Sequence, residues 1–307
     1  MNVKHLLAIR DLSALEVADI LKLTAEVKAH PKRFRKALKG KILAMIFQKP
    51  STRTRVSFEA GIYQLGGTGM YLSSTDLQLG RGETIADTAR VLSRYVNGIM
   101  ARVFSHKILI EMAEHATVPV INGLSDFLHP CQALCDVFTI QEKFGRLKGR
   151  TLAYIGDGNN VAHSLSFASA RTGLNIIIAT PEGYEPDHGV IEWVEKEGPK
   201  EGMTIRLTHD PIEAASHADV IYTDVWASMG QEAEHEKRVN LFKPYQINEA
   251  LMAKARKGAI FMHCLPAHRG EEVTDAVADS PQSVIFDQAE NRLHVQKAIM
   301  LRLMGNM

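Results

Sequence analysis

Residues 41–65 read KILAMIFQKPSTRTRVSFEAGIYQL, an apolar run followed by a polar turn and a helical stretch. The run Ile42–Phe47 has the length and the apolar character of a buried strand. The residues near 54–65 then have the pattern of a helix. A buried strand that leads directly into a helix is typical of a parallel sheet covered by helices on both faces.

The same alternation continues along almost the whole chain. Strands are predicted near residues 41–47, 68–72, 98–104, 118–122, 151–155, 175–179, 204–208, 219–224, 259–263 and 283–286. Helices are predicted from Ser13 to Pro31 and near residues 54–65, 84–96, 106–115, 131–145, 244–257 and 289–304. The pattern predicts an α/β protein with two open parallel-sheet domains, residues 1–147 and 148–307, divided in the polar stretch 145–150.

The composition excludes several classes of protein. The chain has 307 residues, with 36 Lys and Arg against 35 Asp and Glu and 45% hydrophobic residues. A net charge of +1 is too small for a protein that neutralises the phosphates of duplex nucleic acid, and the apolar content argues against disorder. Apolar runs such as Ile42–Phe47 are far shorter than the roughly 18 residues of a membrane span, and Leu6–Ile9 is too short for the core of a signal peptide. We expect a soluble, cytoplasmic protein.

Three cysteines, an odd number, do not suggest a disulfide framework. His129, Cys131 and Cys135 contain potential zinc ligands, but two cysteines four positions apart on a helix, with no second pair nearby, have poor spacing for zinc. We expect Cys131 and Cys135 to be small core residues on one helical face.

Polar side chains follow the strands of the first half at the end where open α/β sheets bind ligands. Ser51-Thr52-Arg53-Thr54-Arg55 combines hydroxyls and arginines at the start of a predicted helix, where backbone N–H groups and the helix dipole attract anions. The alternative is a capped basic turn that only contacts solvent. The position of this motif at a strand end favours phosphate binding. Arg102 in an apolar strand needs either an acidic partner or an anionic ligand. His129 precedes the next helix, whose dipole should keep it neutral unless an anion binds nearby; the alternative is a cap or a surface residue.

The second half has polar strand ends of its own. Gly156-Asp157-Gly158-Asn159-Asn160-Val161 resembles the dinucleotide fingerprint, but its sixth position is Val161 and no acidic residue follows at the expected distance, so a nicotinamide enzyme is disfavoured. Asp224 and Ser228 follow one later strand, and His263 and Cys264 end another. Singly, Asp224 could be a helix cap and Cys264 a small apolar residue.

Four of these motifs, taken together and in this order, resemble those of the ornithine carbamoyltransferases, within the aspartate/ornithine carbamoyltransferase superfamily. The motifs are Ser51-Thr52-Arg53-Thr54-Arg55, His129-Pro130-Cys131-Gln132, Asp224 followed by Ser228-Met229-Gly230, and His263-Cys264-Leu265-Pro266. The first two are shared with aspartate carbamoyltransferases, whereas the last two indicate ornithine. The resemblance implies a carbamoyl phosphate-binding domain and an ornithine-binding domain, with the C-terminal helix packing back on the first.

The resemblance also implies the site residues. Those for carbamoyl phosphate are Ser51, Thr52, Arg53, Thr54, Gln78, Arg102, His129, Pro130, Cys131, Gln132, Cys264, Leu265 and Arg292. Those for ornithine are Asn160, Asp224, Ser228 and Met229. Catalytic roles fall to Arg53, Arg102, His129, Asp224 and Cys264. No metal and no organic cofactor are implied.

The resemblance further implies a homotrimer in which Gln78 reaches the site of a neighbouring subunit. The implied reaction converts L-ornithine and carbamoyl phosphate into L-citrulline and phosphate, and we expect it to serve arginine biosynthesis. The alternatives are a catabolic enzyme, a carbamoyltransferase for a related amine, and an inactive paralogue that only binds ligands.

Overall fold

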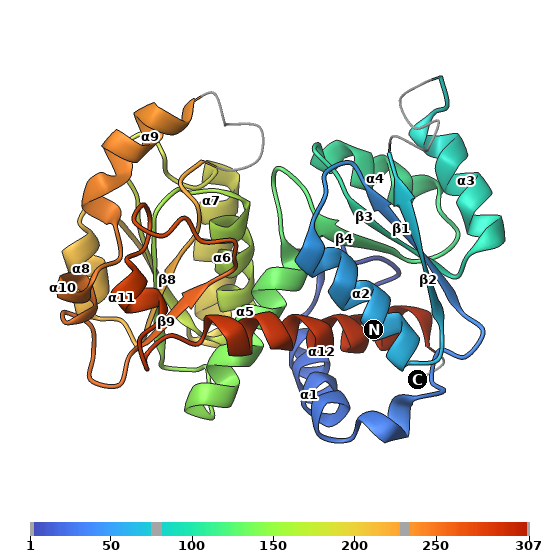
Figure 1. Ribbon diagram of the computed structural model, residues 1–307, viewed down its shortest axis with the longest axis horizontal. Helices are drawn as coiled ribbons and strands as arrows, with labels where there is room; N and C mark the ends of the chain where they lie inside the picture. The colour runs from blue at the N-terminus through green and yellow to red at the C-terminus, as the bar shows by residue number, and fades with distance from the viewer. Residues whose placement is uncertain (1–2, 75–81, 228–233, 306–307) are drawn as a thin grey trace. The chain divides into compact units, whose positions relative to one another are not determined.

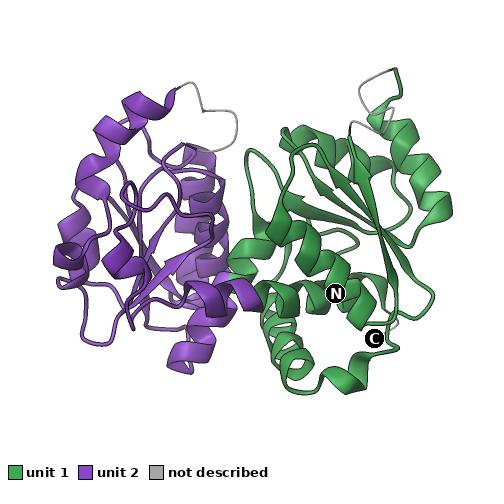
Figure 2. Cartoon of the chain, viewed as in Figure 1, with its two compact units in different colours: residues 1–135, 291–307 green, residues 136–290 purple. Residues whose placement is uncertain are grey.

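The computed structural model describes residues 3–74, 82–227 and 234–305. The chain divides into two compact units, residues 1–135 with 291–307 and residues 136–290 (Figure 2). The divisions fall within helix α5 (Pro130–Phe144) and within helix α12 (Ile285–Met304), so both helices contribute residues to each unit. The boundary expected from the sequence lies somewhat later, in the polar stretch after α5.

Unit 1 contains a parallel sheet in the order β2-β1-β3-β4 (Figure 1). Its strands are β1 (Ile42–Phe47), β2 (Thr68–Ser73), β3 (Gly98–Arg102) and β4 (Val120–Leu124). The central strands are buried runs of apolar residues because helices cover both faces of the sheet. The strands predicted in this half of the sequence are therefore confirmed.

The helices of unit 1 are α1 (Ala14–Ala29), α2 (Thr52–Gln64), α3 (Ile85–Tyr95) and α4 (His106–His115). Helices α3 and α4 cover one face of the sheet through Ala89, Leu109 and Met112. The last helix packs back on this unit, because a Cβ on Gly61 would lie 3.1 Å from Met300 and one on Gly98 would lie 2.9 Å from Met304. A larger residue at either place would require the methionine side chain to shift.

Unit 2 contains a parallel sheet in the order β7-β6-β5-β8-β9. Its strands are β5 (Thr151–Ile155), β6 (Asn175–Ala179), β7 (Ile205–Thr208), β8 (Val220–Thr223) and β9 (Ile260–His263). The chain runs from β5 outward to β7 and then crosses back to β8. The strand order thus reverses between β5 and β8, and open sheets of this kind bind ligands beyond that point.

The helices of unit 2 surround its sheet (Figure 1). They are α6 (Asn160–Thr172), α7 (His188–Glu197), α8 (Pro211–Ser216), α9 (His235–Phe242), α10 (Glu249–Met252) and α11 (Asp275–Ala278). Helices α8, α10 and α11 share one buried core with β5, β6, β8 and β9. In the part of the chain that the structure describes, no helix has both the length and the apolar character needed to cross a membrane.

Two elements predicted from the sequence are wrong. The helix expected at 244–257 is a 3₁₀ turn (Lys243–Tyr245) followed by the short α10, because Ile247 between them forms a bridge with Val273 and its backbone is extended. The strand expected at 283–286 is a single bridge between Ser283 and Phe261, after which α12 begins. Val284 and Ile285 are buried although they form no strand, so their hydrophobicity did not distinguish a strand from the start of a helix.

Candidate functional site

The carboxyl ends of β1, β3 and β4 carry the residues predicted to bind an anion in unit 1. The order of strands in this sheet reverses between β1 and β3, which places the crevice at these ends. The turn after β1 leads into α2, Arg102 ends β3, and His129 lies between β4 and α5. All three segments therefore meet the same edge of one sheet.

Ser51 begins α2 as its N-cap, and its hydroxyl accepts a hydrogen bond from the backbone N–H of Thr54 at 3.3 Å. Thr52 and Arg53 occupy the first turn, where backbone N–H groups are available to an anion. Arg55 is engaged differently, since its guanidinium lies 3.8 Å from the centre of the Tyr71 ring and pairs with Glu59 at 3.4 Å. Of the two arginines of this motif, Arg53 is the one in the first turn.

Arg292 of α12 joins the N-terminal turns of α2 and α5 within unit 1. Its Nη1 donates to Oε1 of Gln132 at 2.5 Å, and its Nη2 donates to the hydroxyl oxygen of Thr54 at 3.1 Å. The residue is only 4% exposed. Among the residues described, none accepts a hydrogen bond from Nε of Arg292, so this buried donor is available to a ligand.

His129 is buried among positive charges. Its burial lowers the pKa of the imidazole well below the ordinary value, and the guanidinium groups of Arg292, Arg102 and Arg53 lower it further. The ring is therefore neutral, and it can donate a hydrogen bond without carrying charge. Three guanidinium groups thus act electrostatically on this imidazole, a charge environment suited to a ligand with more than one negative charge.

Cys131 contributes to this region through packing. It is fully buried, its thiol donates to the backbone carbonyl of Asn122 at 3.4 Å, and burial raises its pKa to about 12. Cys135 is fully buried as well. The expectation that both are small core residues is confirmed.

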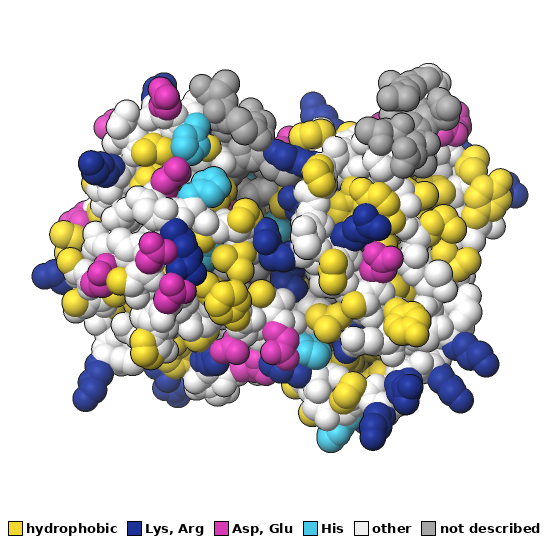
Figure 3. All heavy atoms as spheres, in the orientation of Figure 1, with side chains coloured by type: hydrophobic (Ala, Val, Ile, Leu, Met, Phe, Trp, Pro, Cys, Tyr) yellow, Lys and Arg dark blue, Asp and Glu magenta, His cyan; other side chains and the backbone are white. Residues whose placement is uncertain are grey.

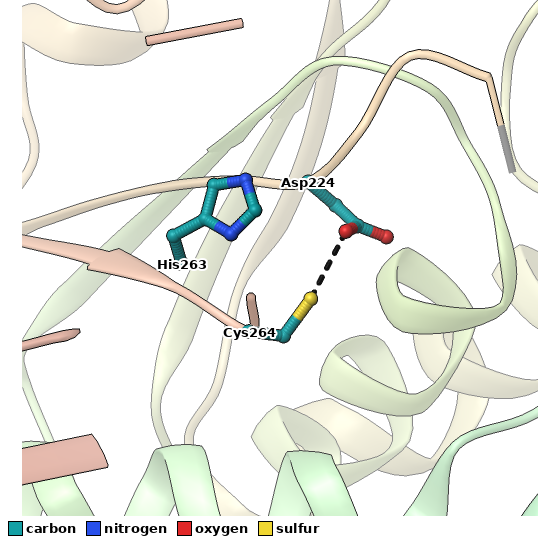
Figure 4. Close-up of side chains that lie close together, drawn as sticks. All are labelled: Asp224, His263 and Cys264. Atoms are coloured by element: carbon teal, nitrogen blue, oxygen red, sulfur yellow. Dashed lines mark hydrogen bonds between the residues drawn. The ribbon is translucent and has the colours of Figure 1, made fainter. Parts of the chain in front are cut away.

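In unit 2, Asp224 follows β8 and is held by groups from two neighbouring strand ends. Asn159 caps α6 with its side-chain oxygen, and its Nδ2 donates to Oδ2 of Asp224 at 3.0 Å. The thiol of Cys264, after β9, donates to Oδ1 of Asp224 at 3.0 Å (Figure 4). Asp224 is 7% exposed, so a nearly buried carboxylate lies at the ligand-binding edge of the sheet.

His263 fixes the loop that follows β9 through a hydrogen bond. The backbone N–H of Leu265, whose φ is +58°, donates to Nδ1 of His263 at 2.9 Å. Because Nδ1 accepts, the ring hydrogen lies on Nε2, which is 3.2 Å from Oε1 of the buried Glu272. The pair orients the loop that carries Cys264 and Leu265.

Asp157 and Arg238 form a buried ion pair beside this half of the site. Nη1 of Arg238 lies 3.0 Å from Oδ2 of Asp157 and also donates to the backbone carbonyl of Trp226 at 3.0 Å. Burial raises the pKa of Asp157 to about 6, and Arg238 opposes that rise. The pair ties α9 to the turn after β5 and to the loop after β8.

The structure thus forms two groups of residues, each within one unit. Unit 1 gathers Ser51, Thr52, Arg53, Thr54, Arg102, His129, Pro130, Cys131, Gln132 and Arg292. Unit 2 gathers Asn160, at the start of α6, with Asp224, Cys264 and Leu265. Gln78, Ser228 and Met229 lie outside the described residues.

Sequence reasoning missed Asn159, Asp157, Arg238 and the orienting role of His263. Asn159 had a usable signal, because an Asn directly before a helix is a strong N-cap and a strand end is where ligands bind. Arg238 had none, since it lies in a charged stretch far along the chain from Asp157.

Comparison with known proteins gives consistent matches over the whole chain. A model of the aspartate/ornithine carbamoyltransferase carbamoyl-P binding domain matches residues 4–142, and a model of the Asp/Orn binding domain of the same family matches residues 148–303. The ornithine carbamoyltransferase of Thermococcus kodakarensis is 62% identical over 304 residues, which cover 98% of this chain and 96% of that protein. The anabolic ornithine carbamoyltransferase of Pyrococcus furiosus is 59% identical, with the same coverage.

Solved structures agree with these relatives. The structure of the ornithine carbamoyltransferase from Pyrococcus furiosus superposes with a TM-score of 0.96 at 58% identity and covers 99% of this chain and 98% of that one. That of the anabolic ornithine carbamoyltransferase from Campylobacter jejuni has a TM-score of 0.93 at 42% identity and covers 98% and 99%.

Proposed function

This chain belongs to the aspartate/ornithine carbamoyltransferase family, and we propose that it transfers the carbamoyl group of carbamoyl phosphate to the δ-amine of L-ornithine, giving L-citrulline and phosphate. The observation that carries the choice of ornithine is Asp224, a nearly buried carboxylate held by Asn159 and Cys264. This carboxylate attracts an ammonium group and repels the acidic side chain of aspartate.

The phosphate of carbamoyl phosphate is assigned to the N-terminus of α2 with Arg53 and Arg102. Negative charge grows on this group as the bond between the carbamoyl carbon and the phosphate oxygen breaks. Backbone N–H groups and guanidinium forks stabilise that charge more as it grows, which accelerates the reaction. The placement of both arginines near His129 supports the assignment.

The carbamoyl oxygen is assigned to Thr54, Arg102 and His129. The oxygen of Thr54 accepts a hydrogen bond from Arg292, so its own hydroxyl hydrogen remains available to donate. The neutral ring of His129 donates in the same way. These donors stabilise the oxygen as it gains charge in the transition state. Cys264 and Leu265 are also assigned to the carbamoyl group.

The attacking group is the neutral δ-amine of ornithine. A lysine-like pKa of about 10.4 leaves about one amine in a thousand neutral at pH 7.4, a cost of about 4 kcal/mol. The nitrogen lone pair forms a bond to the carbamoyl carbon, the bond from that carbon to the phosphate oxygen breaks, and the proton that the nitrogen loses goes to the leaving phosphate. Asp224 holds the α-ammonium and Asn160 donates to the α-carboxylate, while Ser228 and Met229 complete the ornithine site.

The proposed step requires neither a metal ion nor an organic cofactor. Direct attack by the amine also requires no nucleophile from the protein. Cys264 donates its hydrogen to Asp224 and is therefore assigned a positioning role at the amine, without a covalent intermediate.

We propose that the enzyme serves arginine biosynthesis in the cytoplasm. The direction is supported by relatives in Pyrococcus furiosus and Campylobacter jejuni that are named anabolic. The location is supported by the three cysteines, all described, none of which forms a disulfide.

A homotrimer with shared sites is a further part of the proposal, in which Gln78 serves the carbamoyl phosphate site of a neighbouring subunit. An inactive Gln78→Ala variant mixed with an inactive Arg53→Ala variant, after dissociation and reassembly, should regain activity. Hybrid trimers then contain interfaces built from one intact half of each parent. Verified hybrids that stay as inactive as both parents would exclude a shared site.

Carbamoyl phosphate labelled with ¹³C tests the function itself. With ornithine, the label should appear in the ureido carbon of citrulline, with one phosphate released for each citrulline formed. A labelled carbamoyl group attached to the α-nitrogen of ornithine, or release of phosphate without a ureido product, would contradict the proposal. Product only with another amine would assign the chain to a different carbamoyltransferase.

A further inference from the structure

Two histidines and one glutamate come together on the surface of unit 2, apart from the residues assigned to either substrate. Nε2 of His235 lies 3.1 Å from Oε2 of Glu271, and Nδ1 of His268 lies 3.6 Å from the same oxygen. All three potential ligand atoms lie within 4.8 Å of one another. Figure 3 shows histidine side chains beside acidic ones on this face of unit 2.

We propose that His235, His268 and Glu271 bind a divalent transition-metal ion, with Zn²⁺ as the preferred occupant. Ligand atoms about 2.0–2.1 Å from a tetrahedral Zn²⁺ are about 3.3–3.4 Å from one another. The separations of 3.1 and 3.6 Å from Glu271 bracket that value, and the two imidazole nitrogens lie within 4.8 Å of each other, so side-chain rotation alone can bring the three ligands onto one ion. Two imidazoles and one carboxylate are ligands that Zn²⁺ accepts, and water takes the fourth position.

The backbone that carries His268 and Glu271 is held in place from two sides. The N–H of His268 donates to the buried carboxylate of Glu272 at 2.5 Å. The side chain of Gln246 donates to the carbonyl of Glu271 at 2.8 Å, and the N–H of Glu271 closes a turn onto the carbonyl of His268 at 2.9 Å. The loop therefore presents both ligands from a fixed backbone, which reduces the entropy lost on binding.

His235 is presented from a fixed element as well, because it is the first residue of α9. The buried Arg238 ties this helix to Asp157 and to the backbone of Trp226. At the other end of the helix, the ring of Phe242 packs against that of Tyr184 at a centroid distance of 5.0 Å. An ion at the cluster would thus join two segments that are already anchored separately.

The cluster is also accessible. The side chains of His235, His268 and Glu271 are 40%, 45% and 30% exposed. An ion can therefore enter from solvent without opening the structure, and water can complete its coordination. Mg²⁺ prefers an octahedral set of oxygen ligands, so it should not compete at this site.

Titration with Co²⁺, which replaces Zn²⁺ and absorbs visible light when tetrahedral, tests the proposal. The full chain, without a histidine tag and after treatment with a chelator, should bind one Co²⁺ per chain with a tetrahedral spectrum that Zn²⁺ abolishes and Mg²⁺ does not. His235→Gln and His268→Gln should each weaken binding at least tenfold, and Zn²⁺ should raise the melting temperature of the wild type more than that of either variant.

The matched control is His188→Gln. His188 is paired with Glu192 at 3.5 Å, as a histidine is paired with a glutamate in the cluster. Among the described residues, however, this pair has no third potential ligand close enough to share an ion. The variant should therefore bind Co²⁺ as the wild type does. Circular dichroism of each variant establishes that it is folded, and since the substituted side chains are exposed, all three should be.

A second group of potential ligands, Asp224, His263 and Cys264, provides the sharpest alternative. An ion bound there would show a thiolate-to-cobalt charge-transfer band and would be lost in Cys264→Ala. The proposal predicts no such band and unchanged binding in that variant. Absence of tetrahedral Co²⁺, dependence on Cys264, or full binding by the His235→Gln, His268→Gln double variant would each overturn it.

Discussion

Arg292 donates a hydrogen bond from Nη2 to the hydroxyl oxygen of Thr54 at 3.1 Å, across 238 positions of sequence. The last helix therefore supplies a polar side chain to the first turn of α2, within unit 1. The same guanidinium reaches Gln132 at the start of α5, so one residue fixes the relation between two helix N-termini that we assign to carbamoyl phosphate. Helix α12 also packs closely against α2, since a Cβ on Gly61 would lie 3.1 Å from Met300.

Replacing Arg53 by lysine should raise KM for carbamoyl phosphate and lower kcat, each by about tenfold or more, because a single ammonium cannot form the two-pronged contact of a guanidinium. Arg55→Lys is the matched control, since Arg55 belongs to the same motif but contacts Tyr71 and Glu59. Its kinetics should change by less than about threefold. Steady-state kinetics in both substrates measure this, and equal losses in the two variants would contradict the assignment.

Arg238→Met should destabilise the protein more at pH 8 than at pH 5.5. The folded pKa of Asp157 is about 6, above its usual value of 3.8, so the folded state binds more protons between these values and stability falls as pH rises through that window. Without Arg238 the folded pKa of Asp157 should rise further, so the pH range over which stability falls extends upward. At pH 8 the unpaired buried carboxylate should lower the unfolding free energy by about 3–5 kcal/mol.

Urea unfolding at both pH values measures the effect of Arg238→Met. Arg90→Met removes an exposed ion pair with Asp87 and should change stability by less than about 1 kcal/mol at either pH. A loss in Arg238→Met that is the same at pH 5.5 and pH 8 would show that the charge of Asp157 is not its cause.

His129 should make the folded protein less stable in acid. Its folded pKa is well below the ordinary value, so the unfolded chain takes up a proton near pH 6.5 that the folded state does not. The stability present above that pH is lost as pH falls toward the folded pKa, at up to about 1.4 kcal/mol per pH unit. His5, with a pKa lowered to about 4, adds a loss of the same sign.

The His129→Gln variant isolates the contribution of His129, because His5 is unchanged in it. Between pH 6.5 and pH 5, the unfolding free energy of this variant should fall less steeply than that of the wild type. The difference between the two slopes should correspond to the uptake of about one proton on unfolding. Identical slopes in urea unfolding would mean that His129 is not held neutral.

At subsaturating ornithine, turnover should rise with pH from 6.5 to 9. Only the neutral δ-amine attacks, and its fraction grows about tenfold per pH unit below a pKa of about 10.4. Initial rates measured at constant ionic strength and saturating carbamoyl phosphate provide the profile. A flat profile would imply that the protein itself takes the proton from bound ornithine, and Cys264 and Asp224 would then need a role in proton transfer.

The fold was predictable from local pattern to a large extent, and its failures have a common cause. Buried strands are short apolar runs in the sequence, and polar motifs at their ends stand out next to them. The start of the first helix, predicted at Ser13, was equally local, because Ser13 forms a capping box with Glu16, whose N–H donates to the hydroxyl of Ser13 at 3.2 Å. At Ile247, pairing with Val273 overrides a helical pattern, and no local rule reveals that partner.

Some residues of the candidate site were likewise predictable from local sequence, and others were not. The first turn of α2 and the strand-end residue Asp224 were visible in the sequence because residue type and position along a strand or helix sufficed. The contacts of Asn159 with Asp224 and of Arg238 with Asp157 join positions 65 and 81 residues apart, so only the folded chain brings them together. Arg292 entered the prediction through family resemblance alone, since its helix carries no local sign of a ligand.

The central claim is that this chain carbamoylates ornithine, and a comparison of amines tests it most directly. With saturating carbamoyl phosphate, kcat/KM should be measured for L-ornithine, putrescine, N-acetylornithine and L-aspartate, in the wild type and in Asp224→Asn. The account predicts that ornithine exceeds each other amine by at least about a hundredfold. N-acetylornithine leaves the buried carboxylate of Asp224 without its ammonium partner, putrescine leaves Asn160 without a carboxylate, and Asp224 repels the acidic side chain of aspartate. It also predicts that Asp224→Asn narrows the gap between ornithine and N-acetylornithine, because only N-acetylornithine lacks the ammonium group that Asp224 is assigned to hold. A wild type that prefers putrescine, N-acetylornithine or aspartate would contradict it.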